Sequence, residues 1–378
     1  MDIKKIRIAL WIILAFILVV LWTKWQQAHQ PPIIHASHQA VAQAADNGDQ
    51  DQIPQLTATS AAHTTTQLPK MLHHGAAERR ISVTTNTLHL MINLQGGNLV
   101  TAYLREYPKT LHSKQPVALL ATNSNKTYVA QSGIISNLLP SRAISFHAEK
   151  RQYSFKPGMK QLTVNLSAAV NGVKLIKQYI FMPNSYAIKV RYRIDNQSGQ
   201  SFKGRFYGQL LRTEPKKSGN FLMSYANYTG AAISYPGNHF DKVSFKDMRE
   251  QDLQQNALGG WVAMLQHYFI SAWAPDQQQK SEFYSRIYHN DLYTIGFAGP
   301  VVNVPPGQSK ALGATLYVGP AIAKNLEQVA PYLDKTINYG WLWFISILIF
   351  KVMSWIHHYI GNWGWSIVLI TLLIKLIF

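Results

Sequence analysis

Apolar residues near the N-terminus form one continuous run. The run IALWIILAFILVVLW covers residues 8–22 and follows the basic stretch KKIR at residues 4–7. A basic cluster before an apolar segment is typical of an export signal. No small-x-small cleavage site follows closely, and Trp22 and Trp25 suit a membrane interface. We therefore predict an uncleaved transmembrane signal anchor over residues 1–25 with a cytoplasmic N-terminus. A cleaved signal is the alternative, and both readings export the region that follows.

From about residue 81, apolar residues recur at every second position. The stretches TLHLMINL (87–94) and YAIKVRYRI (186–194) show this alternation, which predicts strands with one buried and one solvated face. Asn171-Gly172 lies between two valines and predicts a two-residue hairpin. Helical periodicity does not begin before about residue 322, so residues 81–320 predict a large antiparallel β-sandwich. Further strand-like segments lie near residues 202–211, 261–273, 282–297 and 311–318.

A helical connector, interrupted at Pro331, is predicted over residues 321–338. The apolar run that follows, residues 339–361, has two readings. It is long enough to span a membrane, with Lys351 as its one charge. It could instead lie flat on the membrane, because Lys351, Ser354 and His358 share one helix face and its aromatic residues suit an interface. The pattern alone leaves both readings open.

Residues 26–80 differ from both neighbouring segments in composition. They are rich in Gln, Ala, His and Thr, and no aromatic residue occurs between Trp25 and Tyr103. Such a segment buries too little apolar area to offset its chain entropy, so we predict a flexible linker. Its irregularly spaced histidines favour a solvated polar segment over a metal site. These histidines are His29, His35, His38, His63, His73 and His74.

The charge of the chain changes this picture little. The formal net charge is +18, which first suggests nucleic acid as a partner. The basic residues are scattered, however, and no recognition helix or zinc-finger spacing accompanies them, so we predict no direct nucleic-acid binding. Basic surfaces also suit anionic membranes. The chain contains no cysteine, which is weak support for an oxidising compartment.

Candidate chemistry is sparse in the predicted sandwich. A membrane-tethered, carbohydrate-binding or sugar-active protein is one alternative function, and it would use converging carboxylates or a His–acid pair. No such spaced motif occurs, and GxSxG, HExxH and phosphate-loop motifs are absent. We expect His267 to pack in a half-buried strand. A second alternative is a tethered periplasmic binding or chaperone module. The acidic and histidine candidates are Glu214, Asp241, Asp247, Glu250, His267 and Glu282.

Lys375 interrupts the last apolar run, residues 361–378. A helix that begins near Trp365 would place Lys375 roughly 15 Å along its axis, near the middle of a bilayer about 30 Å thick. A lone cation at that depth costs roughly 2.5–3.5 kcal/mol on insertion scales. Lys375 therefore either reaches a hydrated site or snorkels to an interface near the helix end.

Five stretches of the chain resemble the bacterial YidC membrane-protein insertases. They are GGNLVTAYLREYPKTLHSKQPVALL (96–120), GGWVAMLQHYFISAWAP (259–275), TLYVGP (315–320), YGWLWFIS (339–346) and WIHHYIGNWGWSIVLIT (355–371). The N-terminal anchor and the linker agree with that family in order and length. The resemblance covers essentially the whole chain except the linker.

The resemblance implies an architecture beyond what the pattern shows. Residues 26–80 would be a periplasmic linker, and 81–320 a periplasmic β-supersandwich of the sugar-mutarotase-like type. Residues 339–361 would be an amphipathic helix on the periplasmic face. Residues 362–378 would begin the second transmembrane helix of an α-helical insertase core, and the chain would be truncated within it, because about 14 residues from Trp365 are too few to span. The interfacial residues would be Trp341, Trp343, Lys351 and Trp355.

The resemblance also implies a function for Lys375. In this family the second transmembrane helix carries a basic residue, most often arginine, that faces a hydrophilic intramembrane groove. Lys375 falls on that position, and Thr371 would contact substrate in the same groove. The groove would let a polar segment of a client enter, and the cation would attract acidic side chains of its translocated tail.

The implied protein assists insertion, folding and assembly of inner-membrane proteins, alone or with the Sec translocon. It would be multi-pass in the bacterial inner membrane and would use no catalytic residue, cofactor or metal. Its partners would be nascent membrane proteins, the lipid bilayer and the Sec translocon, with the ribosome reached through a region beyond this chain.

Overall fold

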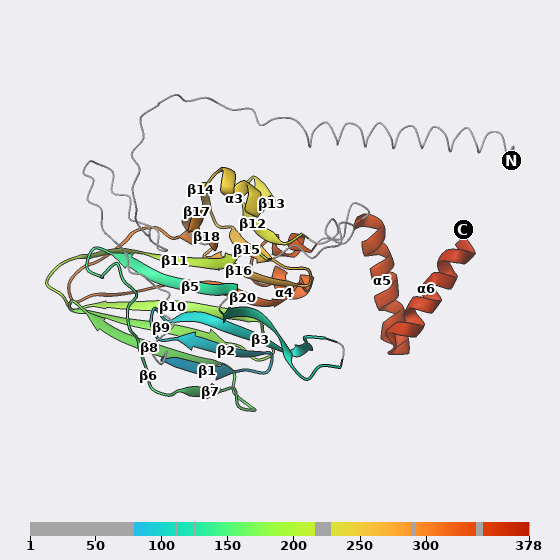
Figure 1. Ribbon diagram of the computed structural model, residues 1–378, viewed down its shortest axis with the longest axis horizontal. Helices are drawn as coiled ribbons and strands as arrows, with labels where there is room; N and C mark the ends of the chain where they lie inside the picture. The colour runs from blue at the N-terminus through green and yellow to red at the C-terminus, as the bar shows by residue number, and fades with distance from the viewer. Residues whose placement is uncertain are drawn as a thin grey trace, which may run out of the picture. The chain divides into compact units, whose positions relative to one another are not determined.

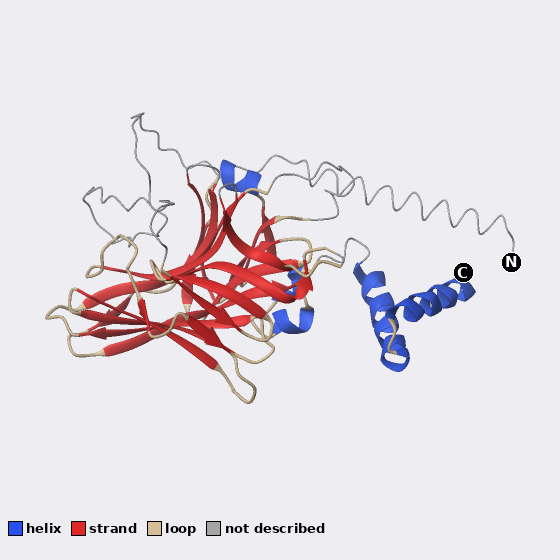
Figure 2. Ribbon diagram, turned by 60° about the horizontal axis from the view of Figure 1, so that its bottom comes forward, coloured by secondary structure: helices blue, strands red, loops and turns tan. Residues whose placement is uncertain are grey.

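The computed structural model describes residues 79–110, 112–123, 126–215, 228–288, 292–337 and 343–377. The predicted anchor, and all but the last two residues of the predicted linker, lie outside these ranges. Strands dominate the described chain and form two facing sheets (Figures 1 and 2). The described chain consists of two bodies, the sandwich and the pair of C-terminal helices.

The larger sheet has eleven strands within the described residues. From one edge to the other they are β14 (Gln254–Leu258), β17 (Lys280–Tyr288), β18 (Leu292–Ala298), β11 (Phe202–Thr213), β5 (Lys126–Ser136), β4 (Pro116–Asn123), β3 (Asn98–Pro108), β2 (Leu88–Asn93), β1 (Arg80–Thr84) and β7 (Gln152–Ser154), with β19 (Val302–Val304) also paired to β11. The β1–β7 pair is parallel, and the other pairs are antiparallel.

The second sheet has nine strands within the described residues, all paired antiparallel. From one edge to the other they are β13 (Asn238–Val243), β12 (Gly230–Tyr235), β15 (Trp261–Leu265), β16 (Phe269–Pro275), β20 (Ser309–Pro320), β10 (Ala187–Asn196), β9 (Val173–Phe181), β8 (Leu162–Val170) and β6 (His147–Ala148). The predicted antiparallel sandwich is confirmed.

The predicted hairpin at Asn171-Gly172 is also confirmed, because Val170 pairs with Val173 across it. Both of its residues have positive φ, +49° for Asn171 and +76° for Gly172. This is the backbone form of a type I′ turn, whose twist matches that of the flanking strands. The turn fixes the register of β8 against β9, and that register sends alternate side chains toward the core.

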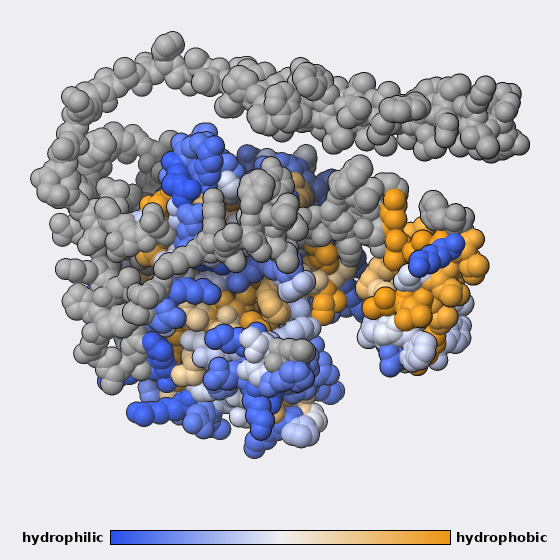
Figure 3. Space-filling model, turned by 45° about the vertical axis from the view of Figure 1, so that its right-hand side comes forward, coloured by the Kyte–Doolittle hydropathy of each residue, from blue (hydrophilic) through white to orange (hydrophobic). Residues whose placement is uncertain are grey.

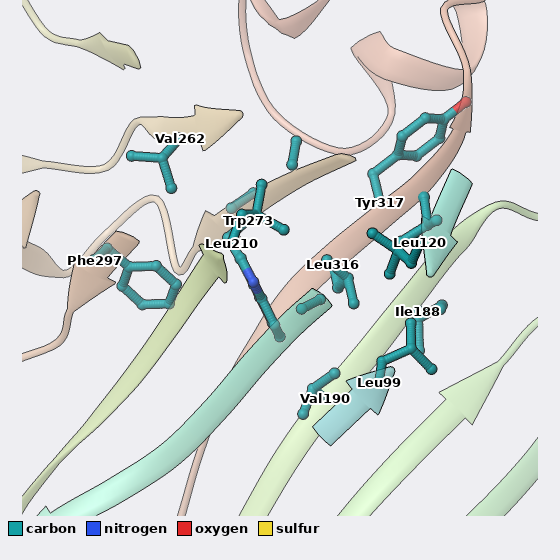
Figure 4. Packing of buried hydrophobic residues seen from close by; sticks show 14 of the residues in the cluster. Leu99, Leu120, Ile188, Val190, Leu210, Val262, Trp273, Phe297, Leu316 and Tyr317 are labelled. Carbon is teal, nitrogen blue, oxygen red and sulfur yellow. The ribbon is translucent and has the colours of Figure 1, made fainter. Parts of the chain in front are cut away.

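The core lies between the two sheets. The alternating residues Leu88, Leu90 and Ile92 of β2 are fully buried, as the period-two pattern predicts. Figure 4 shows side chains of both sheets meeting, with Leu210 and Phe297 from the larger sheet beside Trp273 from the smaller one. The Trp273 and Phe297 ring centroids are 6.3 Å apart.

Close packing explains one glycine of this core. A Cβ atom at Gly208 would lie 2.9 Å from the Trp273 indole and 2.7 Å from Phe297. Only a residue without a side chain lets the indole lie this close to the backbone of β11.

Four predictions are wrong in detail. The segment 261–273 is a hairpin, β15 and β16, and 282–297 lies in two strands, β17 and β18. His267 lies exposed in the turn between β15 and β16 and not in a half-buried strand, because a turn is needed to reverse the chain there. A helix also occurs before residue 322: α3 (Phe245–Glu250), stabilised by a capping box between Ser244 and Asp247.

The chain leaves the sandwich through two short helical turns. These are α4 (Ala323–Glu327) and the 3-10 helix η1 (Leu333–Thr336), which lie on either side of Pro331 as the pattern predicts. Leu326 and Leu333 are fully buried and join the sandwich core. The Trp261 indole Nε1 donates a 3.0 Å hydrogen bond to the Pro331 carbonyl. The turns are therefore part of the packed domain.

Candidate functional site

Two helices at the C-terminal end carry the site residues predicted from sequence. They are α5 (Trp343–Ile360) and α6 (Trp363–Ile377), joined by Gly361 and Asn362. Gly361 has φ +69°, and its N–H donates a 2.7 Å hydrogen bond to the His357 carbonyl, so it ends α5 with a left-handed cap. Asn362 Oδ1 accepts hydrogen bonds from the N–H groups of Gly364 (2.8 Å) and Trp365 (3.4 Å), as an N-cap does.

The two helices pack against each other through a few small and aliphatic residues. Ile356 of α5 and Ser366 and Ile370 of α6 are buried, and Ser366 is fully so. The Ser366 hydroxyl donates a 2.8 Å hydrogen bond to the Asn362 carbonyl, which satisfies its polarity inside the contact. His357 and Trp363 stack across the turn, with ring centroids 3.9 Å apart and an interplanar angle of 13°.

Thr371 and Lys375 lie on one face of α6. They are four residues apart, so their side chains neighbour each other one helical turn apart, and both are exposed. The Thr371 hydroxyl donates a 2.7 Å hydrogen bond to the Ile367 carbonyl of its own helix. The face that packs on α5, marked by Ser366 and Ile370, is a different one. The helix thus presents a hydroxyl and an amine together, away from the partner helix.

The predicted interfacial residues are only partly described. Lys351 and Trp355 are exposed on α5, four residues apart and so on one face, and Trp355 packs edge-on against Tyr359 with ring centroids 5.2 Å apart. Trp343 is the first residue of α5. Trp341 lies outside the described residues.

The two helices expose large apolar side chains of the kinds that are buried in the core of the sandwich. Leu376 is 79% exposed, and Leu348, Trp355 and Trp365 are each 63% exposed. On the face seen in Figure 3, these helices are mostly orange, and the visible sandwich surface is mostly blue.

Lys351 and Lys375 are the charged residues of α5 and α6, which contain no acidic residue. In the described part of the chain, no helix is both long and apolar enough to cross a membrane.

The carboxylates considered for sugar chemistry have structural partners instead. Glu214 Oε2 accepts a 2.7 Å hydrogen bond from Arg249, and Glu282 Oε2 accepts a 3.0 Å bond from Arg205. The Arg205 side chain is only 9% exposed, and it also donates to backbone carbonyls at the β11–β18 edge. The Arg205–Glu282 pair joins β11 to β17, and the Arg249–Glu214 pair joins α3 to the segment that follows β11.

The remaining candidates are equally dispersed. Asp247 caps α3, Glu250 lies 3.6 Å from Lys246 on the same helix, and Asp241 is exposed on β13. His267 stacks edge-on against its neighbour Tyr268 in the exposed turn. Among the described residues, no three His, Cys, Asp or Glu side chains are grouped to hold a metal ion. This arrangement gives no basis for acid–base chemistry on a sugar.

Comparison with known proteins then decides the family. Residues 80–352 match a family model described as the YidC periplasmic domain. The chain belongs to the YidC family. The matched region begins with the first strand of the sandwich and extends into α5, so it joins the two bodies described above in one family sequence.

Relatives in three organisms carry the same name, "Membrane protein insertase YidC". The relative in Coxiella burnetii (strain RSA 331) is 36% identical over 402 residues, and the one in Legionella pneumophila (strain Corby) is 38% identical over 384 residues. The relative in Marinobacter nauticus is 35% identical over 396 residues. Each comparison covers 100% of this chain and 68% or 69% of the relative. This YidC-family chain thus spans about two thirds of their length.

Among solved structures, a galactose mutarotase-like protein from Lactobacillus casei ATCC 334 is 8% identical, with a TM-score of 0.40. The comparison covers 63% of this chain and 99% of that one. A similarity of this size does not support a mutarotase-like assignment, which stays a prediction.

Proposed function

We propose that this chain acts in the insertion of proteins into the bacterial inner membrane, with nascent membrane proteins and lipid as its partners. The observation that carries the proposal is the identity of 35–38% along the whole chain to proteins named membrane protein insertases. The relatives bear the name of an insertase and not of an enzyme. The dispersed carboxylates of the sandwich agree with a role that needs no covalent chemistry.

The Thr371–Lys375 face of α6 is the part of the site proposed to meet the client. Both residues are exposed, and neither α5 nor α6 supplies an acidic side chain to neutralise Lys375. A cation without a partner attracts carboxylates of a client most strongly where the surroundings are poor in water. We assign Lys375 the role of drawing the acidic tail of a client into a hydrophilic groove, with Thr371 as a neighbouring polar contact. Hydrophobic transfer of the client segment into lipid then drives the step.

The α5 helix is proposed to lie at the membrane surface. Support comes from its exposed Lys351 and Trp355, since lysine and tryptophan both favour the boundary between headgroups and acyl chains. Trp341 and Trp343 are proposed to belong to the same interfacial contact. The anchor, linker and topology predicted from sequence complete the proposal, with the sandwich in the periplasm. We also propose the Sec translocon as a partner, and the ribosome through sequence beyond this chain.

The test is rescue of an insertase-depleted bacterium by the gene's complete reading frame, followed by insertion assays with acidic-tailed clients. Lys375→Glu should abolish rescue, because it repels the acidic tail, and Lys375→Arg should retain it. The matched control is Lys246→Glu, which reverses an exposed lysine on α3 of the sandwich. Rescue by Lys375→Glu equal to that by Lys246→Glu would remove Lys375 from the mechanism. Failure of the unaltered gene to rescue would refute the insertase function itself.

A further inference from the structure

The outer face of the nine-stranded sheet, the face turned away from the larger sheet, has a covered half at β15 and β16. Val262 and Trp273 of these strands point into the core (Figure 4), so the residues that alternate with them point outward. Those outward residues are small or apolar, and they are buried. They are Trp261, Ala263, Leu265, Ile270, Ala272 and Ala274.

The segment that covers this half is the one through which the chain leaves the sandwich, α4 and η1. The Trp261 indole bonds to the Pro331 carbonyl between these two turns. A side-chain hydrogen bond also joins Asn325 of α4 to Tyr317, which occupies an outward position of β20 because its neighbour Leu316 pairs with Trp273. The chain therefore leaves the sandwich over the outer face of this sheet.

The open half of the same face is formed by β8, β9, β10 and the first part of β20, and it is basic. Lys189, Arg191 and Arg193 alternate along β10 with residues that are buried in the core, and all three are exposed. Lys174 of β9 is exposed beside them, opposite Asp195. We call Lys174, Lys189, Arg191 and Arg193 the basic face.

Acidic side chains do not balance the basic face. Asp195 is the one Asp or Glu in the four strands, and it accepts a 2.8 Å hydrogen bond from Arg193 Nε. Among the described residues, no ion pair joins Lys174, Lys189 or Arg191 to a carboxylate. Neighbouring cations on β10 are two residues apart, roughly 7 Å, so they repel one another and gain from an anionic partner.

The neighbours of the β10 cations on β20 are small. Gly313 lies opposite Arg191, and Ala311 lies opposite Arg193. A Cβ atom at Gly313 would lie 3.1 Å from Arg191 Cγ, so the missing side chain leaves room for the arginine to lean over β20. Both edges of β9 and of β10 are paired within the sheet, so no polypeptide can add to them as a strand. The basic face thus offers a sheet surface of cations and not a strand edge.

We propose that the basic face binds the anionic headgroup surface of a phospholipid membrane. Lysine and arginine near such a surface are attracted by its negative potential, and the arginine fork also matches two phosphate oxygens. The covalent chain favours lipid over an acidic protein as the partner. η1 ends at Thr336 and α5 begins at Trp343, so at most roughly 25 Å of chain joins the covered half of this face to α5. This step rests on the proposed place of α5 at the membrane surface.

The test measures energy transfer from the sandwich to labelled lipid. Because the chain contains no cysteine, one introduced cysteine carries a single donor dye. Asn165→Cys places the dye on β8 of the open half, and Asn256→Cys places it on β14 of the larger sheet, where the asparagine is also exposed. The full chain is held in lipid nanodiscs with an acceptor dye on the headgroups. Replacing half of the phosphatidylcholine by phosphatidylglycerol should raise transfer from position 165 more than from position 256.

Removing the cations of β10 should abolish this rise. Lys189→Gln, Arg191→Gln and Arg193→Gln are combined in one variant. Each cation near an anionic surface contributes on the order of fivefold to binding, so the docking equilibrium constant should fall by roughly a hundredfold. All three side chains are exposed, so the variant should fold, and circular dichroism checks that it does.

A matched control removes the same charge elsewhere and should keep the rise. It combines substitutions by Gln of three exposed lysines on β11, α3 and β17. The three lysines are Lys203, Lys246 and Lys280. A second measurement needs no variant: at about 1 M salt the unaltered chain should lose the rise, because the screening length falls to about 3 Å.

Four results would overturn the proposal. Transfer from position 165 that does not respond to phosphatidylglycerol is the first, and an undiminished rise in the folded β10 variant is the second. An equal rise at positions 165 and 256 would show attraction of the whole basic chain and not of this face. A response of the dye at position 165 to an oligoglutamate peptide, without any response to phosphatidylglycerol, would assign the face to an acidic polypeptide. No client protein is present, so rescue by the gene remains a separate test of the insertase function.

Discussion

The sandwich and the C-terminal helices treat the same residue type in opposite ways. Trp261 and Trp273 are 0% and 1% exposed between the sheets, whereas Trp355 and Trp365 are each 63% exposed on the helices. Burial of an indole stabilises a fold in water, but an exposed indole gains that stabilisation only from another apolar phase or partner. One chain therefore combines a domain that buries its own apolar side chains with helices whose apolar side chains stay exposed and need an apolar phase or partner to cover them.

Four cations show the reverse arrangement. Lys177 and Arg212 are buried in the sandwich, whereas Lys351 and Lys375 are exposed on the helices. In the sandwich a buried cation is held by backbone carbonyls or a ring, and its surroundings are fixed by the sheets. On the helices the lysines have no acidic neighbour, so their partners come from outside the pair. The comparison separates groups that serve stability from groups that are available for binding.

The largest expected effect comes from removing the same side chain in each body. Trp273→Ala deletes a buried indole and the 3.1 Å hydrogen bond from its Nε1 to the Gln209 carbonyl. It should lower the free energy of unfolding of the sandwich by about 3–5 kcal/mol, as large-to-small core substitutions do. Urea unfolding of the full chain in micelles, followed by near-UV circular dichroism, measures the change.

Trp365→Ala is the matched control for this experiment. Because the Trp365 indole is exposed on α6, its removal should leave the urea midpoint of the sandwich unchanged and weaken partition into lipid vesicles. Equal losses of sandwich stability in the two variants would contradict the contrast between the two bodies.

Much of the sandwich is predictable because its strands alternate cleanly. Leu88–Asn93 and Ala187–Asn196 have inward residues at every second position, and Asn171-Gly172 marks a turn through its backbone preference. The helix α3 was missed because its six residues are too few for a helical period to show. The capping signal Ser244-x-x-Asp247 was nevertheless present in the sequence.

The site is predictable to a smaller extent. The shared face of Thr371 and Lys375 follows from their four-residue spacing, but their exposure depends on which face of α6 packs on α5, which the nearly uniform apolar sequence does not specify. The buried cations were missed for another reason. Lys177 lies two residues from both Leu175 and Tyr179, and Arg212 lies two residues from Leu210, so each cation shares a strand face with buried residues. The period-two pattern therefore places both cations inside, against the usual preference of charged residues for the surface. A charged residue at an inward position of the period-two pattern was the signal in the sequence that could have revealed these buried cations.

The second largest effect should be a pH dependence that Lys177 gives to the sandwich. Burial lowers the pKa of Lys177 well below its ordinary 10.5. Between the folded and unfolded pKa values the unfolded chain binds more protons, so the free energy of unfolding should rise with pH, by at most about 1.4 kcal/mol per unit. Lys177→Met should remove this slope in the pH range just below the unfolded value of 10.5.

The control for this slope is Lys189→Met, which removes an exposed lysine from β10 of the same sheet. Urea unfolding at a series of pH values should show the unaltered slope in Lys189→Met. If Lys177→Met kept that slope as well, the buried amine would not be the group that titrates.

A smaller effect, confined to the helices, should follow from Gly361→Ala. Gly361 has φ +69°, a conformation that alanine adopts only with strain, while an added Cβ would meet no described atom within 4 Å. The cost is therefore conformational and about 1 kcal/mol. Hydrogen exchange should show about fivefold faster exchange of α6 amides, with sandwich amides unchanged. Faster exchange in both bodies would mean that they unfold together.

The smallest structural effect is expected at Thr371, where structure and function can be separated most cleanly. The Thr371 hydroxyl bonds to the Ile367 carbonyl of its own helix, so Thr371→Val keeps the shape of the side chain and should change helix stability by less than about 0.5 kcal/mol. If the hydroxyl also contacts a client, insertion should slow by about twofold, the value of a weak hydrogen bond. Insertion assays and hydrogen exchange on the same variant measure the two effects separately.

Leu372→Val is the control, because it places a valine at the neighbouring exposed position without removing a polar group. Any slowing that it shares with Thr371→Val reports the β-branched side chain and not the hydroxyl. Slowing in Thr371→Val alone, with unchanged exchange of α6 amides, would show that an exposed group on these helices serves the client and not the fold. Equal insertion by both variants would instead leave Lys375 as the sole candidate for that role on the face that the two residues share.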